Sequence, residues 1–142
     1  MSTSKKLVAL LVEDYSDSRE MLRLLLQGSD WQILEASDAI EGFKLATIYQ
    51  PALIITDLNL PGIDGIELVR QLRKSDDWLE IVPIIMVTAI DDEASRHMAL
   101  AAGVNRFFTK PVNFKLLESA ISELIQEASL QKEDSKKKNS LK

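Results

Sequence analysis

The apolar residues of this chain gather in five short runs, separated by longer stretches in which apolar and polar residues mix. Runs 7–12, 52–55 and 83–87 show no polar alternation, which is typical of strands buried on both faces of a parallel sheet. Runs 31–36 and 104–108 are less regular but also predict strands. The pattern therefore predicts five strands.

The stretches between the runs carry apolar residues at helical spacing and have capping or helix-ending residues at their borders. Strand and helix alternate five times, which predicts an α/β fold whose parallel sheet is covered on both faces by right-handed crossovers. The predicted helices are 16–27, 38–49, 65–74, 91–102 and 113–128, and 75–81 is expected to be a polar connector.

The size and composition of the chain limit what it can do. Its 142 residues fit one domain, and its net charge of -5 argues against a nucleic-acid-binding body. It has no cysteine, which excludes disulfides, thiol catalysis and thiolate metal sites. The longest apolar run is too short for a signal peptide or a bilayer span, so we expect a cytoplasmic protein without membrane insertion.

Segment 129–142 differs from the rest in composition. It holds five lysines and two acidic residues, so its net charge is +3 and the preceding 128 residues carry -8. Few of its residues are large and apolar. We expect a solvated, disordered tail. Five lysines are only a weak signal for binding to membrane or nucleic acid.

Polar side chains follow four of the five predicted strands: Glu13-Asp14, Asp57, Thr88 and Lys110. The carboxyl ends of parallel strands lie at one edge of a sheet, so we expect these side chains to converge. Each of them, taken alone, is equally compatible with an ordinary helix cap, turn residue or surface lysine. Their joint occurrence at strand ends favours a functional site.

Three carboxylates in one pocket repel each other unless a cation lies among them, and Lys110 can neutralise only one. Oxygen ligands of this kind suit Mg²⁺. The same set suits phosphoryl transfer, with Asp57 as the nucleophile that forms an acyl phosphate. Mg²⁺ and Lys110 would stabilise the charge on the phosphoryl oxygens, and Thr88 would donate a hydrogen bond to one of them.

The pattern resembles the receiver domain of two-component response regulators, in particular the single-domain, chemotaxis-regulator-like type, over residues 5–128. The most specific signal is the D-x-x-(L/M)-P-x-x-(D/N)-G run from Asp57 to Gly65, which accompanies Glu13-Asp14, Thr88-Ala89 and Lys110-Pro111. The resemblance implies a flavodoxin-like, doubly wound five-stranded parallel sheet of order 2-1-3-4-5 with five helices.

The resemblance also implies that a histidine kinase or a histidine phosphotransfer protein phosphorylates Asp57. Mg²⁺ would bind through Asp14, Asp57 and the backbone carbonyl of Asn59, with Glu13 acting through a water. A protein of this kind is not an enzyme for other substrates, because it catalyses only its own phosphorylation and dephosphorylation.

A switch is implied as well. In this family the Lys110-Pro111 bond is usually cis. Phosphorylation would draw Thr88 inward and let Phe107 rotate into the vacated space. The output surface for a downstream protein would be 92–128, which holds the fourth predicted helix, the fifth strand and the fifth helix. We expect a monomer or a phosphorylation-dependent dimer, and a long-lived phosphoryl group because Ile90 cannot orient water.

Other functions fit the residues less well. A haloacid-dehalogenase-like phosphatase needs an aspartate where Asn59 stands. In a flavin-binding module, Glu13-Asp14 would repel the flavin phosphate. The only histidine, His97, is expected to be a surface residue. The chain is either a stand-alone receiver, which we favour, or a receiver excised from a larger regulator.

Overall fold

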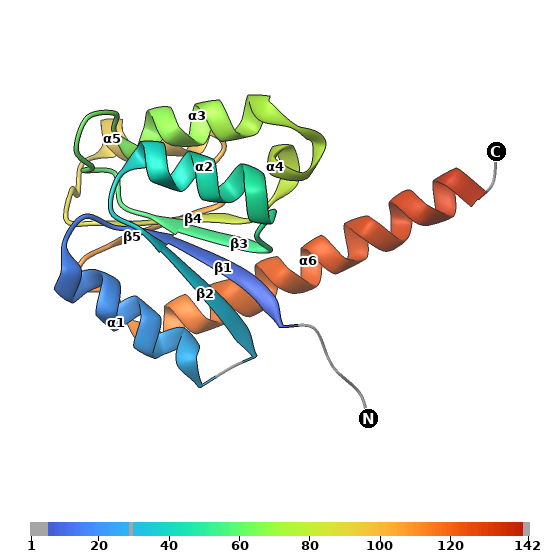
Figure 1. Ribbon diagram of the computed structural model, residues 1–142, viewed down its shortest axis with the longest axis horizontal. Helices are drawn as coiled ribbons and strands as arrows, with labels where there is room; N and C mark the ends of the chain where they lie inside the picture. The colour runs from blue at the N-terminus through green and yellow to red at the C-terminus, as the bar shows by residue number, and fades with distance from the viewer. Residues whose placement is uncertain (1–5, 29, 141–142) are drawn as a thin grey trace.

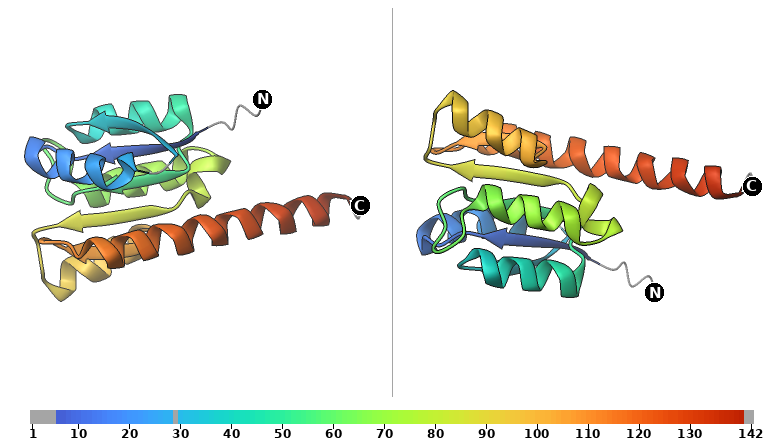
Figure 2. Two further views of the ribbon diagram at one scale, coloured as in Figure 1. Left: turned by 90° about the horizontal axis from the view of Figure 1, so that it is seen from below. Right: turned by 90° about the horizontal axis from the view of Figure 1, so that it is seen from above.

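The computed structural model describes residues 6–28 and 30–140, and in this part of the chain a five-stranded parallel sheet has the order β2-β1-β3-β4-β5. The sheet lies between two layers of helices (Figures 1 and 2). Both the fold class and the strand order expected from the resemblance are confirmed. The strands are β1 Leu7–Val12, β2 Trp31–Ala36, β3 Leu53–Thr56, β4 Ile84–Thr88 and β5 Arg106–Thr109.

The described residues form six helices where the sequence predicts five. Asp38, Asp64, Asp76 and Asp92 each precede a helix and accept a hydrogen bond from a backbone N–H three residues on, a cap that typically stabilises a helix by about 1 kcal/mol. The helices are α1 Ser16–Gln27, α2 Ala39–Tyr49, α3 Gly65–Ser75, α4 Asp77–Ile81, α5 Glu93–Ala102 and α6 Phe114–Ser140.

Helix α4 lies in the segment expected to be a connector. Asp76 caps it by accepting from the Leu79 N–H at 2.8 Å, and the Leu79 side chain is fully buried. One turn with one buried leucine is too short to show a helical repeat in the sequence. The fourth and fifth predicted helices are therefore α5 and α6 of the structure.

Helix α6 also differs from the prediction, because it continues to Ser140 instead of ending near Ala128. Residues 112–142 contain no glycine or proline, and most of 129–140 are residues with fair or good helix propensity, lysine, glutamine and glutamate among them. The helix extends beyond the ends at which the strands begin (Figures 1 and 2). The remainder of the predicted tail, 141–142, and the start of the predicted domain at Lys5 lie outside the described residues.

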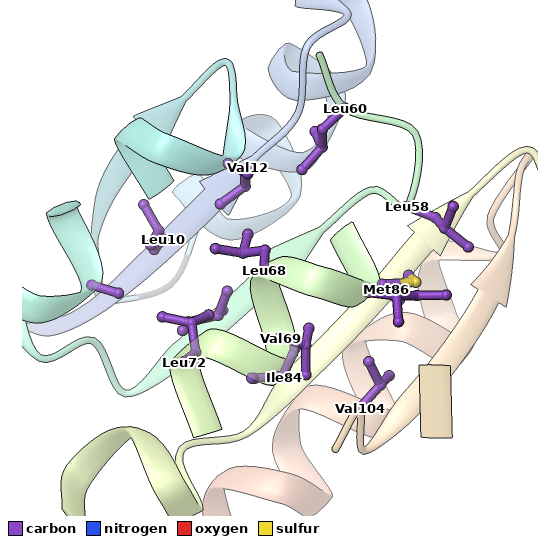
Figure 3. Packing of buried hydrophobic residues seen from close by; sticks show 14 of the residues in the cluster. Leu10, Val12, Leu58, Leu60, Leu68, Val69, Leu72, Ile84, Met86 and Val104 are labelled. Atoms are coloured by element: carbon purple, nitrogen blue, oxygen red, sulfur yellow. The ribbon is translucent and has the colours of Figure 1, made fainter. Parts of the chain in front are cut away.

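Alternate residues of the central strands supply two separate cores. On one face, Leu10, Ile84 and Met86 pack with residues of α2, α3 and α5 (Figure 3). On the other face, Ala9 and Ile85 pack with residues of α1 and α6. Every residue of β3 and β4 is buried, which explains why these strands lack polar alternation.

None of the helices in the described part of the chain combines the length and the apolar content that a bilayer span requires.

Candidate functional site

The carboxyl ends of β1, β3 and β5 bring three charged side chains together. Val12 is in register with Thr56, so Glu13 and Asp57 follow neighbouring strands. On the other side of β3, Thr88 closes β4, and Lys110 follows β5. The convergence that the sequence predicts is confirmed for Glu13, Asp57 and Lys110.

Lys110 is the centre of this cluster. Its Nζ donates to Oδ2 of Asp57 at 3.0 Å, to Oε1 of Glu13 and to Oγ of Ser18 at 3.3 Å. The two carboxylates are buried, with exposed fractions of 2% for Glu13 and 7% for Asp57. A buried charge is tolerated only when it is paired, and Lys110 supplies this pairing to both.

The surroundings of Asp57 favour its ionised form. Burial raises the pKa of Asp57, but hydrogen bonds from the Thr88 hydroxyl, the Lys110 ammonium and the Asn59 N–H have the larger combined effect, and the pKa is lowered from its ordinary value. The Asn59 N–H lies 3.1 Å from Oδ1 of Asp57. Asp57 is therefore available as an oxygen nucleophile.

The contact between Glu13 and Lys110 also shifts the pKa of each of these two residues. Burial raises the pKa of Glu13, and its hydrogen bond with Lys110 offsets this only in part because Asp57 repels the same charge. Burial lowers the pKa of Lys110, but the hydrogen bonds to Glu13 and Asp57 have the larger effect, and the pKa is raised. Lys110 therefore remains an ammonium at neutral pH.

Asp14 lies outside the contacts that Lys110 makes with Glu13 and Asp57. Its side chain is exposed, and within the described ranges no group of three or more Asp, Glu or His residues could hold a metal ion. Lys110 thus bridges two of the three carboxylates and partly neutralises their charge, and the role of Asp14 as a metal ligand stays a prediction. The donor set still fits Mg²⁺, which uses one or two carboxylates and keeps several waters.

The peptide bond between Lys110 and Pro111 is cis, as the resemblance implies. The Lys110 N–H donates to the carbonyl of Thr88 at 2.8 Å. The start of this loop is therefore tied to the end of β4.

The structure explains why the motif that begins at Asp57 ends in a glycine, Gly65. A Cβ at position 65 would lie 2.0 Å from the carbonyl oxygen of Asp57, far inside van der Waals contact. The Gly65 N–H donates to the carbonyl of Leu58 at 2.7 Å, and Asp64 caps α3. The motif thus packs the first turn of α3 directly against the backbone of Asp57.

Helix α1 supplies two further contacts that the sequence analysis did not identify. Besides Ser18, Arg19 donates to the carbonyl of Glu13 at 2.9 Å and lies 3.4 Å from a carboxylate oxygen of Glu35. These residues hold the loop after β1 between α1 and the end of β2. A serine and an arginine near a helix start are too common to signal such a role.

The predicted switch residues lie on neighbouring strands. Thr88 is fully buried, and Phe107 is partly buried against the core that includes α3. The Arg96 guanidinium of α5 lies 5.0 Å from the centroid of the Phe107 ring, a cation–π distance that the sequence analysis did not anticipate. His97 is exposed and lies 3.3 Å from Glu93, which agrees with its interpretation as a surface residue.

Known proteins are similar to this chain in sequence. Residues 9–122 match the family model described as the response regulator receiver domain. The transcriptional regulatory protein AfsQ1 of Streptomyces coelicolor is 33% identical over 89% of this chain and 54% of its own length. An uncharacterized 14.6 kDa protein of Leptolyngbya boryana is 34% identical over 80% of this chain and 86% of its own. The chain spans about half the length of most of the curated relatives it matches.

Solved structures of response regulators and receiver domains have a similar fold. The chemotaxis response regulator CheY4 of Vibrio cholerae has a TM-score of 0.77 and 25% identity, covering 84% of this chain and 98% of its own. The receiver domain of a Pseudomonas aeruginosa sensor histidine kinase, with a magnesium ion coordinated in its active-site cleft, has a TM-score of 0.78 and 26% identity. That match covers 85% of this chain and 98% of the other.

Proposed function

Because the chain belongs to the response regulator receiver domain family of two-component signalling, we propose that it is a phosphoacceptor whose phosphorylated residue is Asp57. One observation carries this proposal: a buried aspartate with a lowered pKa lies 3.0 Å from a lysine ammonium at the end of a parallel sheet. The arrangement joins a nucleophile with a fixed positive charge.

In the proposed reaction, a carboxylate oxygen of Asp57 attacks the phosphorus of a phosphohistidine. The new P–O bond forms as the P–N bond breaks, and the electron pair of that bond returns to the imidazole nitrogen. Lys110 stabilises the negative charge on the transferred oxygens, and the Thr88 hydroxyl donates to one of them.

Mg²⁺ is the proposed cofactor. Asp57, Asp14 and the Asn59 carbonyl would hold it, with Glu13 acting through a water. When bound, it supplies further positive charge to the phosphoryl oxygens. The raised pKa of Glu13, caused by burial and by repulsion from Asp57, supports the proposal because a cation at this position relieves that repulsion.

The proposed partners are proteins. Receiver domains of response regulators interact with histidine kinases, and we propose such a kinase or a histidine phosphotransfer protein as the phosphodonor, in the cytoplasm. The protein turns over no other substrate in this proposal, so it is not an enzyme in the ordinary sense.

The output surface would be α5, β5 and α6. Movement of Thr88 toward the phosphoryl group would let Phe107 turn inward and change this surface, on which Met98, Leu100 and Leu116 are exposed. A downstream protein, or a second copy of the chain in a phosphorylation-dependent dimer, would bind there.

The test is intact-mass analysis after incubation with acetyl phosphate and Mg²⁺. Wild type should gain one phosphoryl group, and Asp57→Asn should gain none. Asp77→Asn, the same change at an exposed position of α4, should behave as wild type. An adduct on Asp57→Asn, or none on wild type, would overturn the proposal.

A further inference from the structure

The three donors of the Lys110 ammonium are fully used in this structure. A lysine ammonium has three N–H groups, and the structure supplies three side-chain acceptors: Glu13, Asp57 and Ser18. Glu13 and Asp57 are carboxylates, and Ser18 is a neutral hydroxyl in the first turn of α1. The three contacts together define the direction of the ammonium.

Two of these acceptors change partners in the proposed reaction. Asp57 forms a bond to phosphorus, and Glu13 has a proposed contact with a magnesium-bound water. Ser18 takes part in neither step. Its hydroxyl is therefore the acceptor whose contact with Lys110 neither change alters.

Ser18 is also the acceptor on the side of Lys110 that faces an apolar groove. Lys110 borders a groove of about 300 Å³ between α1 and the loop after β5. Among the residues lining this groove, only Ser18 carries a side-chain oxygen. The others are Met21, Leu22, Val87, Pro111, Val112 and Phe114.

We propose that Ser18 is a positioning residue for phosphorylation, whose hydroxyl holds the Lys110 ammonium on the phosphoryl site while Glu13 and Asp57 exchange partners. This inference rests on the proposed function. Without the hydroxyl, one N–H of Lys110 turns to solvent beside an apolar groove, and the ammonium rotates away from the direction that charge stabilisation needs.

The experiment measures the rate of Asp57 phosphorylation by acetyl phosphate at saturating Mg²⁺, over a range of acetyl phosphate concentrations. Ser18→Ala should lower the rate at saturation about fivefold, the effect of losing roughly one hydrogen bond, with little change in the half-saturating concentration. Ser18→Thr, which keeps the hydroxyl, should restore most of the rate.

Ser119→Ala is the matched control, since Ser119 is exposed on α6; it should keep the wild-type rate. A wild-type rate for Ser18→Ala would overturn the inference while the proposed function stands. Equal losses in Ser18→Ala and Ser18→Thr would also overturn it, because the hydroxyl would not be the cause. Absence of any adduct on wild type would instead overturn the proposed function, and this inference with it.

Discussion

The guanidinium of Arg73 on α3 donates to the carbonyl oxygen of Gly103 from Nε at 3.1 Å and from Nη2 at 2.6 Å. The same side chain also donates to the carbonyls of Leu79 and Val82, at 2.9 and 2.7 Å. Burial lowers the pKa of Arg73. One side chain thus joins α3 to the ends of α4 and α5.

Replacing Arg73 should destabilise the fold without touching the site. Arg73→Ala leaves several carbonyls without a donor, and we expect a loss of about 3 kcal/mol in the free energy of unfolding, measured by urea denaturation. Arg73→Lys should not restore it, because an ammonium cannot reproduce the planar fork of donors. Arg70→Ala, at an exposed ion pair of the same helix, should change stability by about 0.5 kcal/mol or less. Equal effects at both positions would contradict this role.

Gly65→Ala should disturb the site directly. The new Cβ would overlap the Asp57 carbonyl, so the backbone at Asp57 or the start of α3 must move. We expect a loss of about 2 kcal/mol in unfolding free energy and slower phosphorylation by acetyl phosphate. Gly28→Ala is the control, since a Cβ at position 28 would have no heavy atom within 4 Å beyond the adjoining backbone. If Gly65→Ala matched Gly28→Ala in both measurements, the steric argument would be wrong.

The lowered pKa of Asp57 predicts a pH dependence of stability. A carboxylate whose pKa is lower in the folded than in the unfolded state stabilises the fold above its unfolded pKa, and this contribution is lost as the pH falls through the folded pKa. The stability of wild type relative to Asp57→Asn should therefore fall as the pH is lowered below the ordinary aspartate value of 3.8. Urea denaturation of both proteins at neutral and acidic pH measures it. A constant difference would refute the prediction.

Ile90 should prolong the phosphorylated state. It is partly buried against the core beside Thr88, and its apolar side chain cannot orient a hydrolytic water. Ile90→Glu should accelerate loss of the phosphoryl group several-fold, measured by intact mass after removal of acetyl phosphate. Ile48→Glu, an exposed isoleucine of α2, should leave the decay unchanged. No acceleration in Ile90→Glu would count against the prediction.

The sequence predicts the sheet well because its central strands are buried on both faces. Among them, Leu7–Val12 forms a strand with the predicted bounds. The partly buried edge strand Trp31–Ala36 also has the predicted bounds. Helix α4 was missed because five residues show no periodicity. The end of α6 was missed because lysine-rich composition favours both solvated coil and exposed helix.

The sequence predicts those site residues that directly follow a strand, because the order of the strands fixes their positions. Glu13, Asp57 and Lys110 follow strands and therefore converge. Asp14 is next to Glu13 in sequence, but its exposure depends on the course of the loop, which no local pattern encodes. Contacts such as Ser18 with Lys110, 92 positions apart, require the packed structure.

The strand order has a consequence for the length of one side chain. Asp57 follows β3 and Lys110 follows β5, with β4 between them, so their strands are separated by two inter-strand spacings, about 10 Å. The lysine crosses this gap on its flexible four-carbon stem. A shorter side chain with the same charge would leave its ammonium short of Asp57. Position 110 must therefore supply reach as well as charge.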